Sequence, residues 1–400
     1  MKRITSLIVL LMISVVVCNA QNTCEHCRNL LKTAKNVYRT KGKEVARKSF
    51  ERVYNCKCES VVKDAKKWWA DQEKPSPKQT PKTKKPIAKN SKYQTETSKE
   101  SIEPLYNFKC LKTLEGHSNW VNSVSWSPDG KYLASVSSPA TLIIWDAKSG
   151  EKLKTLEGHS NFVESVCWSP DGRYLASGSG DKTVIIWDAK SGQKLKTLKG
   201  HSKQVNSVSW SPDGKYLASG SWDKTVIIWD ANSGQKLKTL KGHSYEVESV
   251  CWSPDGNYLA SGSYDKTVIL WDANRGEKLK TLEGHSAGIY SVSWSPDGKY
   301  MASGSSDDTI IIWDAKSGEK LKTLEGHFWG VNSVCWSPDG KYLASGSVDK
   351  TVVILYAKSG SELKTLKGHS KQVNSVCWSP DGKYLASGSE DNTVKIWGVE

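Results

Sequence analysis

A Gly-His pair recurs seven times in the chain, and each pair follows the previous one after 42 residues. The pairs are Gly116-His117, Gly158-His159, Gly200-His201, Gly242-His243, Gly284-His285, Gly326-His327 and Gly368-His369. Between them the sequence is nearly constant and reads LKTLEGHS, VxSVxWSPDGKYLASGS and xDKTVIIWDAKSG. A period of this length indicates one structural unit that is copied and stacked on itself, so the fold of the repeat decides the fold of the chain.

Each unit contains four short strand signals separated by turns. KLKTL and VxSVxW alternate polar and apolar residues, as half-buried strands do. Ser-Pro-Asp-Gly then predicts a turn, YLASGS a third strand, and the apolar run TVIIW a strand covered on both faces. Lys-Ser-Gly ends the unit with a hairpin, in which Gly192 and its equivalents supply the left-handed position.

Five units end the apolar run with a Trp-Asp pair. These pairs are Trp145-Asp146, Trp187-Asp188, Trp229-Asp230, Trp271-Asp272 and Trp313-Asp314, whereas the last two units have Leu355-Tyr356 and Trp397-Gly398. Together with the Gly-His pairs, they resemble the WD-repeat β-propeller family over residues 105–400. The resemblance implies an all-β fold with seven blades, each a four-stranded antiparallel sheet.

The two ends of the repeat region favour a closed ring. The chain stops at Glu400, directly after the seventh TVKIW strand, so the last unit lacks its outer strand. The segment from Tyr106 to Leu114 precedes the first unit and has the KLKTL pattern. We expect this N-terminal strand to complete the last blade and remove the open edge.

The first 20 residues have the pattern of a secretory signal. Lys2 and Arg3 precede the apolar stretch from Ile4 to Val17, and Cys18-Asn19-Ala20 follows. A helix of that stretch is about 21 Å long, shorter than the roughly 30 Å membrane core. The sequence therefore predicts a signal peptide over residues 1–20 and an exported protein that is periplasmic, cell-surface or secreted, with retention as an anchor left open.

The segments between this signal and the repeats differ in composition. Residues 21–71 predict a small helical region, and residues 72–104 a flexible linker rich in Lys and Pro. Of the net charge of +15, residues 21–104 carry +11, from 21 Lys/Arg and 10 Asp/Glu. The propeller is nearly neutral, so no specific nucleic-acid binding is expected of it, and membrane contact is limited to an uncleaved signal or the basic linker.

Two sets of cysteines remain after Cys18. Cys24, Cys27, Cys56 and Cys58 lie in the helical region, where an exported protein favours two disulfides and a four-thiolate zinc site is the alternative. Four others, at one repeated strand position that holds serine in the other units, are expected to be free thiols, because copies on separate blades should not pair: Cys167, Cys251, Cys335 and Cys377. Cys110 belongs to neither of these two sets.

The repeated histidines and aspartates favour a structural role, because one pair occurs in every unit except the first and the pairs do not converge. The aspartates stand in the turn before TVIIW and are Asp181, Asp223, Asp265, Asp307, Asp349 and Asp391. The resemblance implies a hydrogen-bonded network of loop His, strand Ser, turn Asp and strand Trp that stiffens each blade. The first unit has Pro139 in place of the aspartate and the sixth lacks the tryptophan, so we expect these two blades to be less rigid.

The chain has no phosphate loop, dinucleotide fingerprint, zinc-protease motif or nucleophile elbow. The sequence therefore predicts a protein that is not an enzyme, with no catalytic residue, no metal and no cofactor.

The few positions at which the units differ predict the binding face. They follow each histidine or precede the turn aspartate, and in this family such loops surround the mouth of the central channel. The predicted residues are Trp120, Asn122, Phe162, Glu164, Gln204, Asn206, Trp222, Tyr245, Glu246, Glu248, Tyr264, Tyr290, Phe328, Trp329, Asn332, Gln372 and Glu390. Random drift of surface loops is the alternative, but drift should not accumulate exposed aromatic residues.

These features predict a non-catalytic scaffold that binds a protein or peptide. The glutamates among the variable residues favour a ligand with basic residues. A carbohydrate-binding module is the alternative, because exposed aromatic rings also stack on sugars.

Overall fold

The computed structural model describes Leu105 and residues 107–399, and before them only Lys63 and Lys67. The predicted signal, nearly all of the helical region, the linker, and Cys24, Cys27, Cys56 and Cys58 lie outside the described residues. Within the described part, no helix has the length and apolar character needed to span a membrane.

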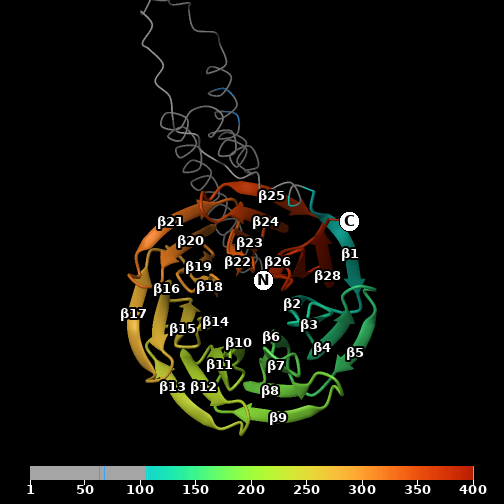
Figure 1. The fold of residues 1–400 in the computed structure, drawn as a ribbon, viewed down its shortest axis with the longest axis vertical. Helices are drawn as coiled ribbons and strands as arrows, with labels where there is room; N and C mark the ends of the chain where they lie inside the picture. Colours follow the sequence, from blue (N-terminus) through green and yellow to red (C-terminus); the bar gives the residue numbers. More distant parts are fainter. Residues whose placement is uncertain (1–62, 64–66, 68–104, 106, 400) are drawn as a thin grey trace, which may run out of the picture. The chain divides into compact units, whose positions relative to one another are not determined.

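Seven four-stranded antiparallel sheets surround a central axis as the blades of a propeller (Figure 1). This confirms the predicted all-β architecture and blade number. Each blade contains one inner strand, two middle strands and one outer strand, joined by short turns.

The strands have nearly identical lengths in all blades. The inner strands are β2 (Val121–Trp126), β6 (Val163–Trp168), β10 (Val205–Trp210), β14 (Val247–Trp252), β18 (Ile289–Trp294), β22 (Val331–Trp336) and β26 (Val373–Trp378). The second strands are β3 (Tyr132–Ser137), β7 (Tyr174–Ser179), β11 (Tyr216–Ser221), β15 (Tyr258–Ser263), β19 (Tyr300–Ser305), β23 (Tyr342–Ser347) and β27 (Tyr384–Ser389). The third strands are β4 (Thr141–Asp146), β8 (Thr183–Asp188), β12 (Thr225–Asp230), β16 (Thr267–Asp272), β20 (Thr309–Asp314), β24 (Thr351–Tyr356) and β28 (Thr393–Gly398). The outer strands are β5 (Lys152–Leu156), β9 (Lys194–Lys199), β13 (Lys236–Lys241), β17 (Glu277–Glu283), β21 (Lys320–Glu325), β25 (Glu362–Lys367) and β1 (Lys109–Glu115).

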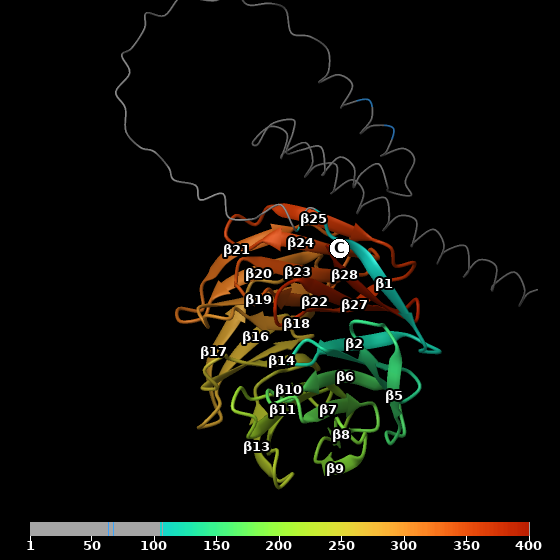
Figure 2. The ribbon, with the colours of Figure 1, turned by 45° about the vertical axis from the view of Figure 1, so that its right-hand side comes forward.

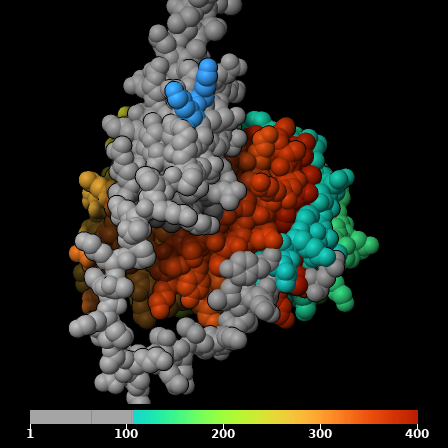
Figure 3. Space-filling model, turned by 90° about the horizontal axis from the view of Figure 1, so that it is seen from above, coloured from blue at the N-terminus to red at the C-terminus, as the bar shows by residue number. Residues whose placement is uncertain are grey.

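The ring closes through β1, which pairs antiparallel with β28 from Lys109↔Gly398 to Glu115↔Thr393 (Figure 2). The seventh blade therefore consists of β26, β27, β28 and β1. Figure 3 shows residues from the start and the end of the propeller side by side on its surface. As expected, the strand that precedes the first unit completes the last blade.

The hydrophobic core lies between the blades rather than in one central cluster. One cluster, for example, joins Ile144 and Leu156 of the first blade to Val163, Trp168 and further residues of the second. Because each cluster takes residues from two adjacent blades, a single blade cannot bury its apolar side chains alone. This accounts for the need for a complete ring.

Hydrogen bonds between inner strands add to this packing. The indole N–H of Trp168 donates to the carbonyl of Ser125 at 3.1 Å, and the backbone N–H of Val166 donates to Ser123 Oγ at 3.3 Å. Trp336 and Trp378 are exceptions, since their indole N–H groups are buried and have no hydrogen-bond partner in the described structure. The sixth blade is therefore joined to its neighbours by fewer hydrogen bonds.

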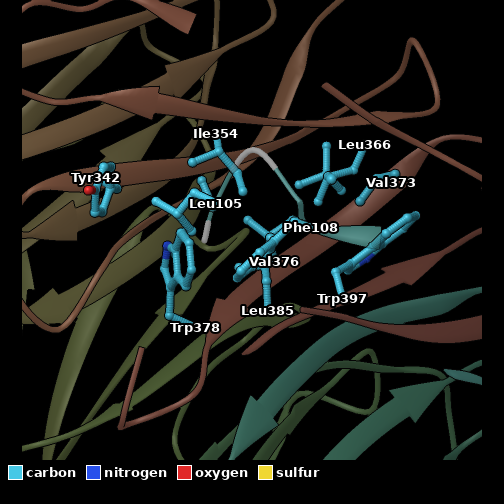
Figure 4. Close-up of a cluster of buried hydrophobic side chains, with 12 residues drawn as sticks. Leu105, Phe108, Tyr342, Ile354, Leu366, Val373, Val376, Trp378, Leu385 and Trp397 are labelled. Atoms are coloured by element: carbon cyan, nitrogen blue, oxygen red, sulfur yellow. The ribbon is translucent and has the colours of Figure 1, made fainter. Parts of the chain in front are cut away.

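Leu105 and Phe108 precede β1 and lie in the core between the sixth and seventh blades (Figure 4). Both side chains are buried, and the Phe108 ring lies 5.9 Å from the Trp378 ring. The segment before β1 thus extends the closure of the ring as far as the sixth blade. The repeat pattern could not indicate this, because no other unit contains an equivalent of these two residues.

Candidate functional site

Two loops of each blade lie at the same end of the strands. In the third blade, Val205 at the start of β10 pairs with Ser221 at the end of β11, so the loops before β10 and after β11 are adjacent. The backbone N–H of Trp222 in the second loop donates to the carbonyl of Gln204 in the first at 3.0 Å. The same bond occurs in the other blades from the second to the seventh, with Gly180, Tyr264, Ser306, Val348 and Glu390 as donors.

Side-chain amides connect these loops from blade to blade. Asn122 Nδ2 donates to the carbonyl of Val163 at 3.0 Å, and Asn332 Nδ2 donates to that of Val373 at 3.1 Å. Each bond runs from the fifth residue after a Gly-His histidine to the start of the next inner strand. The variable positions therefore follow one another around the ring at the same end of the blades.

The repeated histidines form hydrogen-bond chains inside the blades. In the second blade, His159 Nδ1 lies 2.8 Å from Asp181 Oδ2, and His159 Nε2 lies 2.8 Å from Ser177 Oγ. The indole N–H of Trp187 donates to the same serine oxygen at 2.8 Å. Each chain of contacts stays within its blade and joins a loop, a turn and two strands, so it organises the loops that carry the variable residues.

The first and sixth blades depart from this arrangement. His117 Nε2 lies 2.6 Å from Ser135 Oγ, but Nδ1 is buried and has no partner in the described structure, because Pro139 replaces the aspartate. Burial, with a smaller effect of the Lys152 charge, lowers the pKa of His117 to about 4. In the sixth blade, Leu355 replaces the tryptophan, and Ser345 Oγ donates to the carbonyl of Val353 at 3.4 Å.

Most of the predicted aromatic residues are exposed. Six of them have between 40% and 58% of their surface exposed: Trp120, Trp222, Tyr245, Tyr264, Phe328 and Trp329. Phe162 and Tyr290 are half-buried instead. The six exposed rings belong to the first, third, fourth and sixth blades, so this end of the propeller presents several separate apolar surfaces.

Polar residues of the third and fourth blades form a connected cluster around Glu248. Asn206 Nδ2 donates to Glu248 Oε2 at 2.6 Å, and Trp222 Nε1 donates to Oε1 at 3.1 Å. Gln204 Nε2 donates to Asn206 Oδ1 at 2.8 Å. We call Gln204, Asn206, Trp222, Tyr245 and Glu248 the blade 3–4 cluster. Next to it, Lys224 Nζ lies 5.2 Å from the centre of the Tyr245 ring.

The fifth blade continues this surface. The hydroxyl oxygens of Tyr264 and Tyr290 lie 3.2 Å apart, and the two rings meet edge to face. Burial and the hydrogen bond with Tyr264 raise the pKa of Tyr290 above its usual value. The Tyr290 hydroxyl therefore stays neutral near pH 7 and can donate or accept a hydrogen bond.

Two glutamates at this end of the ring are half-buried and hold protons unusually well. Burial raises the pKa of Glu164 to about 7. Burial also raises the pKa of Glu248 to about 7, although hydrogen bonds from Asn206 and Trp222 oppose the change. The charges of Glu164 and Glu246 add to the increase at Glu248. A cation placed beside these carboxyl groups would favour their ionised form.

The remaining predicted residues lie away from the blade 3–4 cluster. Gln372 Nε2 donates to Glu390 Oε1 at 2.6 Å in the seventh blade, and burial raises the pKa of Glu390. Phe162 packs over Gly180, where an added Cβ would lie 2.7 Å from the phenylalanine ring. The structure thus brings together the predicted residues of the third to fifth blades and Glu164 of the second, whose charge acts on Glu248, whereas those of the sixth and seventh blades lie elsewhere around the ring.

The cysteines of the inner strands have one contact that sequence reasoning missed. A hydrogen bond with Cys377 raises the pKa of Cys335 well above its usual value, and burial adds to this. The two thiols therefore meet across the boundary between the sixth and seventh blades, and both are free cysteines, as predicted for this strand position. Among the described residues, no group of three or more His, Cys, Asp or Glu side chains could hold a metal ion.

Family models match the repeat region. Residues 140–308 match the WDR3 first beta-propeller domain, residues 248–400 match the WDR19 first beta-propeller, and residues 108–146 match the WD domain, G-beta repeat. The chain belongs to the WD-repeat β-propeller family. The seven four-stranded blades agree with this membership.

Similar curated proteins match short segments of this WD-repeat protein. Nuclear distribution protein PAC1-2 of Uncinocarpus reesii is 52% identical over 44 residues, which are 11% of this chain and 10% of that protein. Protein HIRA of Dictyostelium discoideum is 48% identical over 40 residues, 10% of this chain and 4% of that protein. Nuclear distribution protein nudF of Aspergillus niger is 34% identical over 74 residues, 18% of this chain and 17% of that protein. The matches thus span less than a fifth of each relative.

These relatives contradict the predicted export of the WD-repeat protein. Several of them are nuclear distribution proteins, which points against a periplasmic, cell-surface or secreted location. The prediction rested on residues 1–20 alone and was wrong. A short apolar stretch after two basic residues reports local hydrophobicity, and hydrophobicity by itself does not determine where a protein is delivered.

Proposed function

We propose that the WD-repeat protein is a non-catalytic scaffold that binds a protein or peptide through the loops around one end of its channel. The observation that carries this proposal is the set of six aromatic side chains, each at least 40% exposed, in loops that otherwise repeat almost unchanged. Aromatic rings of this kind supply much of the binding energy in protein interfaces. The names of the relatives give no support to the carbohydrate-binding alternative.

The blade 3–4 cluster is the best candidate for the centre of this interface. Trp222 exposes a large ring beside the half-buried carboxyl group of Glu248, and Tyr245 exposes a second ring in the loop before β14. Hydrogen bonds from Asn206 and Trp222 fix the position of that carboxyl group before a ligand arrives. Such preorganisation reduces the entropy cost of binding.

The carboxyl groups support a ligand that contains a basic residue. Glu164 and Glu248 ionise near neutral pH, and an arginine or lysine beside them would gain a charged hydrogen-bond partner. Lys224, which lies over Tyr245, already provides an example of a cation on an aromatic ring of the cluster.

Affinity capture with the full chain tests the proposal. We expect the double variant Trp222→Ala/Trp329→Ala to retain less than about a tenth of the partner recovered by the unchanged protein, because interface aromatics often contribute 2 kcal/mol or more. Leu195→Ala is the matched control, since Leu195 is similarly exposed (44%) but lies on the outer strand β9. Equal recovery by the double variant and the control would show that these loops do not bind the partner.

A further inference from the structure

The groove between the sixth and seventh blades holds a peptide segment of the chain itself. Leu105 and Phe108 lie three residues apart, and their side chains are only 7% and 4% exposed. Figure 4 shows them among Ile354, Val376 and Trp378. A leucine and an aromatic residue at this spacing thus pack into one boundary between blades, where a cavity of about 680 Å³ remains beside them.

An equivalent groove between the fourth and fifth blades is open. Leu270, Leu279 and Trp294 line it at the repeat positions that Ile354, Leu363 and Trp378 occupy in the filled groove. Its cavity has a volume of about 620 Å³. Leu279 is 46% exposed, whereas its counterpart Leu363 is half-buried and packs against the cluster that contains Leu105 and Phe108.

In several of the grooves, a tyrosine at the edge stacks on the tryptophan. Between the first and second blades, the rings of Tyr132 and Trp168 are stacked, with their centres 6.3 Å apart. In the filled groove, Tyr342 instead meets Tyr356 edge to face, and Phe108 contacts Trp378. A bound aromatic residue therefore requires the tyrosine to turn aside.

In the groove between the fourth and fifth blades, this tyrosine position holds Tyr258. Tyr258 is 41% exposed and is the most exposed of the tyrosines at this repeat position. A side chain with this exposure has fewer packing contacts to lose when it changes rotamer.

We propose that this groove binds an extended segment of another protein that carries a leucine and an aromatic residue three positions apart. The walls of the groove carry Lys280 and Lys316 as well as Asp255 and Asp297. These charges complement a segment with one acidic and one basic flank, as in the chain's own Glu-Pro-Leu-Tyr-Asn-Phe-Lys sequence at residues 103–109. The site is separate from the loops assigned to the proposed scaffold function and does not depend on them.

Fluorescence anisotropy with a labelled synthetic peptide, EPLYNFK, tests this site on the full chain. We expect Leu279→Asp to weaken peptide binding by about tenfold or more, because it places a charge among the apolar side chains that line the groove. Leu237→Asp is the matched control, since Leu237 has the same position and exposure (45%) in the preceding blade. We expect it to change binding by less than about twofold.

A second peptide, EPAYNAK, lacks both apolar anchors and should not bind. Thermal melting of both variants establishes that they remain folded. No binding of EPLYNFK by the unchanged protein, or an equal loss in Leu279→Asp and Leu237→Asp, would overturn the assignment. Neither result would affect the capture experiment on the aromatic loops, so the two proposals can fail separately.

Discussion

The indole nitrogen of Trp222 donates a 3.1 Å hydrogen bond to the carboxyl group of Glu248, although the two residues belong to different blades. This bond joins an exposed aromatic ring to a glutamate that titrates near neutral pH. We therefore expect binding at the proposed site to depend on pH.

Binding of a basic partner should strengthen as the pH rises from 6 to 8. Glu164 and Glu248 have pKa values raised to about 7, so both carry protons at pH 6 and are ionised at pH 8. Because only the ionised form attracts a cation, the dissociation constant should fall by about tenfold over this range. Calorimetric titration of the captured partner at both pH values measures the change. In Glu248→Gln the pH dependence should be smaller, and an equal dependence would argue against a role for this glutamate.

Completing the network of the first blade should stabilise the protein. Replacing Pro139 and Ala140 with Asp and Lys reproduces the Asp181-Lys182 turn of the second blade and supplies a partner for His117 Nδ1. We expect a gain of about 1 kcal/mol in the free energy of unfolding, the usual contribution of one hydrogen bond. The pKa of His117 should also rise from about 4, because a neighbouring carboxylate favours the imidazolium form. Urea denaturation and NMR titration measure the two effects, and an unchanged pKa would mean that the new carboxylate does not reach the ring.

The glycines of the seven Gly-His pairs should differ in how well they tolerate replacement by alanine. A Cβ at Gly200 would lie 2.9 Å from the Trp229 ring, whereas a Cβ at Gly326 would lie 3.8 Å from Leu355. We therefore expect Gly200→Ala to lower the free energy of unfolding by about 1–3 kcal/mol through overpacking. Gly326→Ala should stay within about 0.5 kcal/mol of the unchanged protein. Chemical denaturation compares the two, and equal losses would show that the tryptophan does not set the tolerance.

Acid should destabilise the propeller through the turn aspartates. Burial opposes the ionisation of Asp349, but hydrogen bonds from His327 and Thr351 outweigh it and hold the pKa at about 2, below its usual value of 3.8. A carboxyl group whose pKa is lowered on folding adds stability above pH 4, and this stability is lost as the pH falls toward 2. The contribution of Asp349 is about 2 kcal/mol.

Urea denaturation at pH 7, 4 and 2.5 measures this loss. Asp349→Asn should be less stable at pH 7 and should lose less stability than the unchanged protein between pH 4 and 2.5. An identical loss in both proteins would mean that Asp349 does not titrate in this range. The buried histidines act in the same direction at higher pH, because burial lowers the pKa of His117 and His159, so the unfolded chain binds more protons below pH 6.5.

The fold could be predicted almost completely from the repeat, because each 42-residue unit contains all the strands, turns and hydrogen-bonding residues of one blade. Closure by β1 could also be predicted, since residues 109–115 repeat the pattern of an outer strand. The burial of Leu105 and Phe108 between the sixth and seventh blades could not be predicted, because these residues have no counterpart in the other units. They contact Trp378, which is 270 residues away from Phe108 in the sequence.

The candidate site was predictable as a set of loops but not as a connected cluster. Variation among the copies identifies Trp222 and Glu248 as unlike their neighbours. It does not indicate that the two side chains meet, because that depends on the rotamers of residues in adjacent blades. For the same reason the contact between Cys335 and Cys377 was missed.

The pairing of β1 with β28 has a consequence for synthesis on the ribosome. Strand β1 must wait, with its backbone groups unpaired to β28, until residues 393–398 have been translated almost 280 residues later. Six sheets can assemble during that interval, but the seventh cannot begin to include β1. Nascent chains interrupted before this point therefore expose two strand edges, which makes them targets for chaperones and prone to self-association.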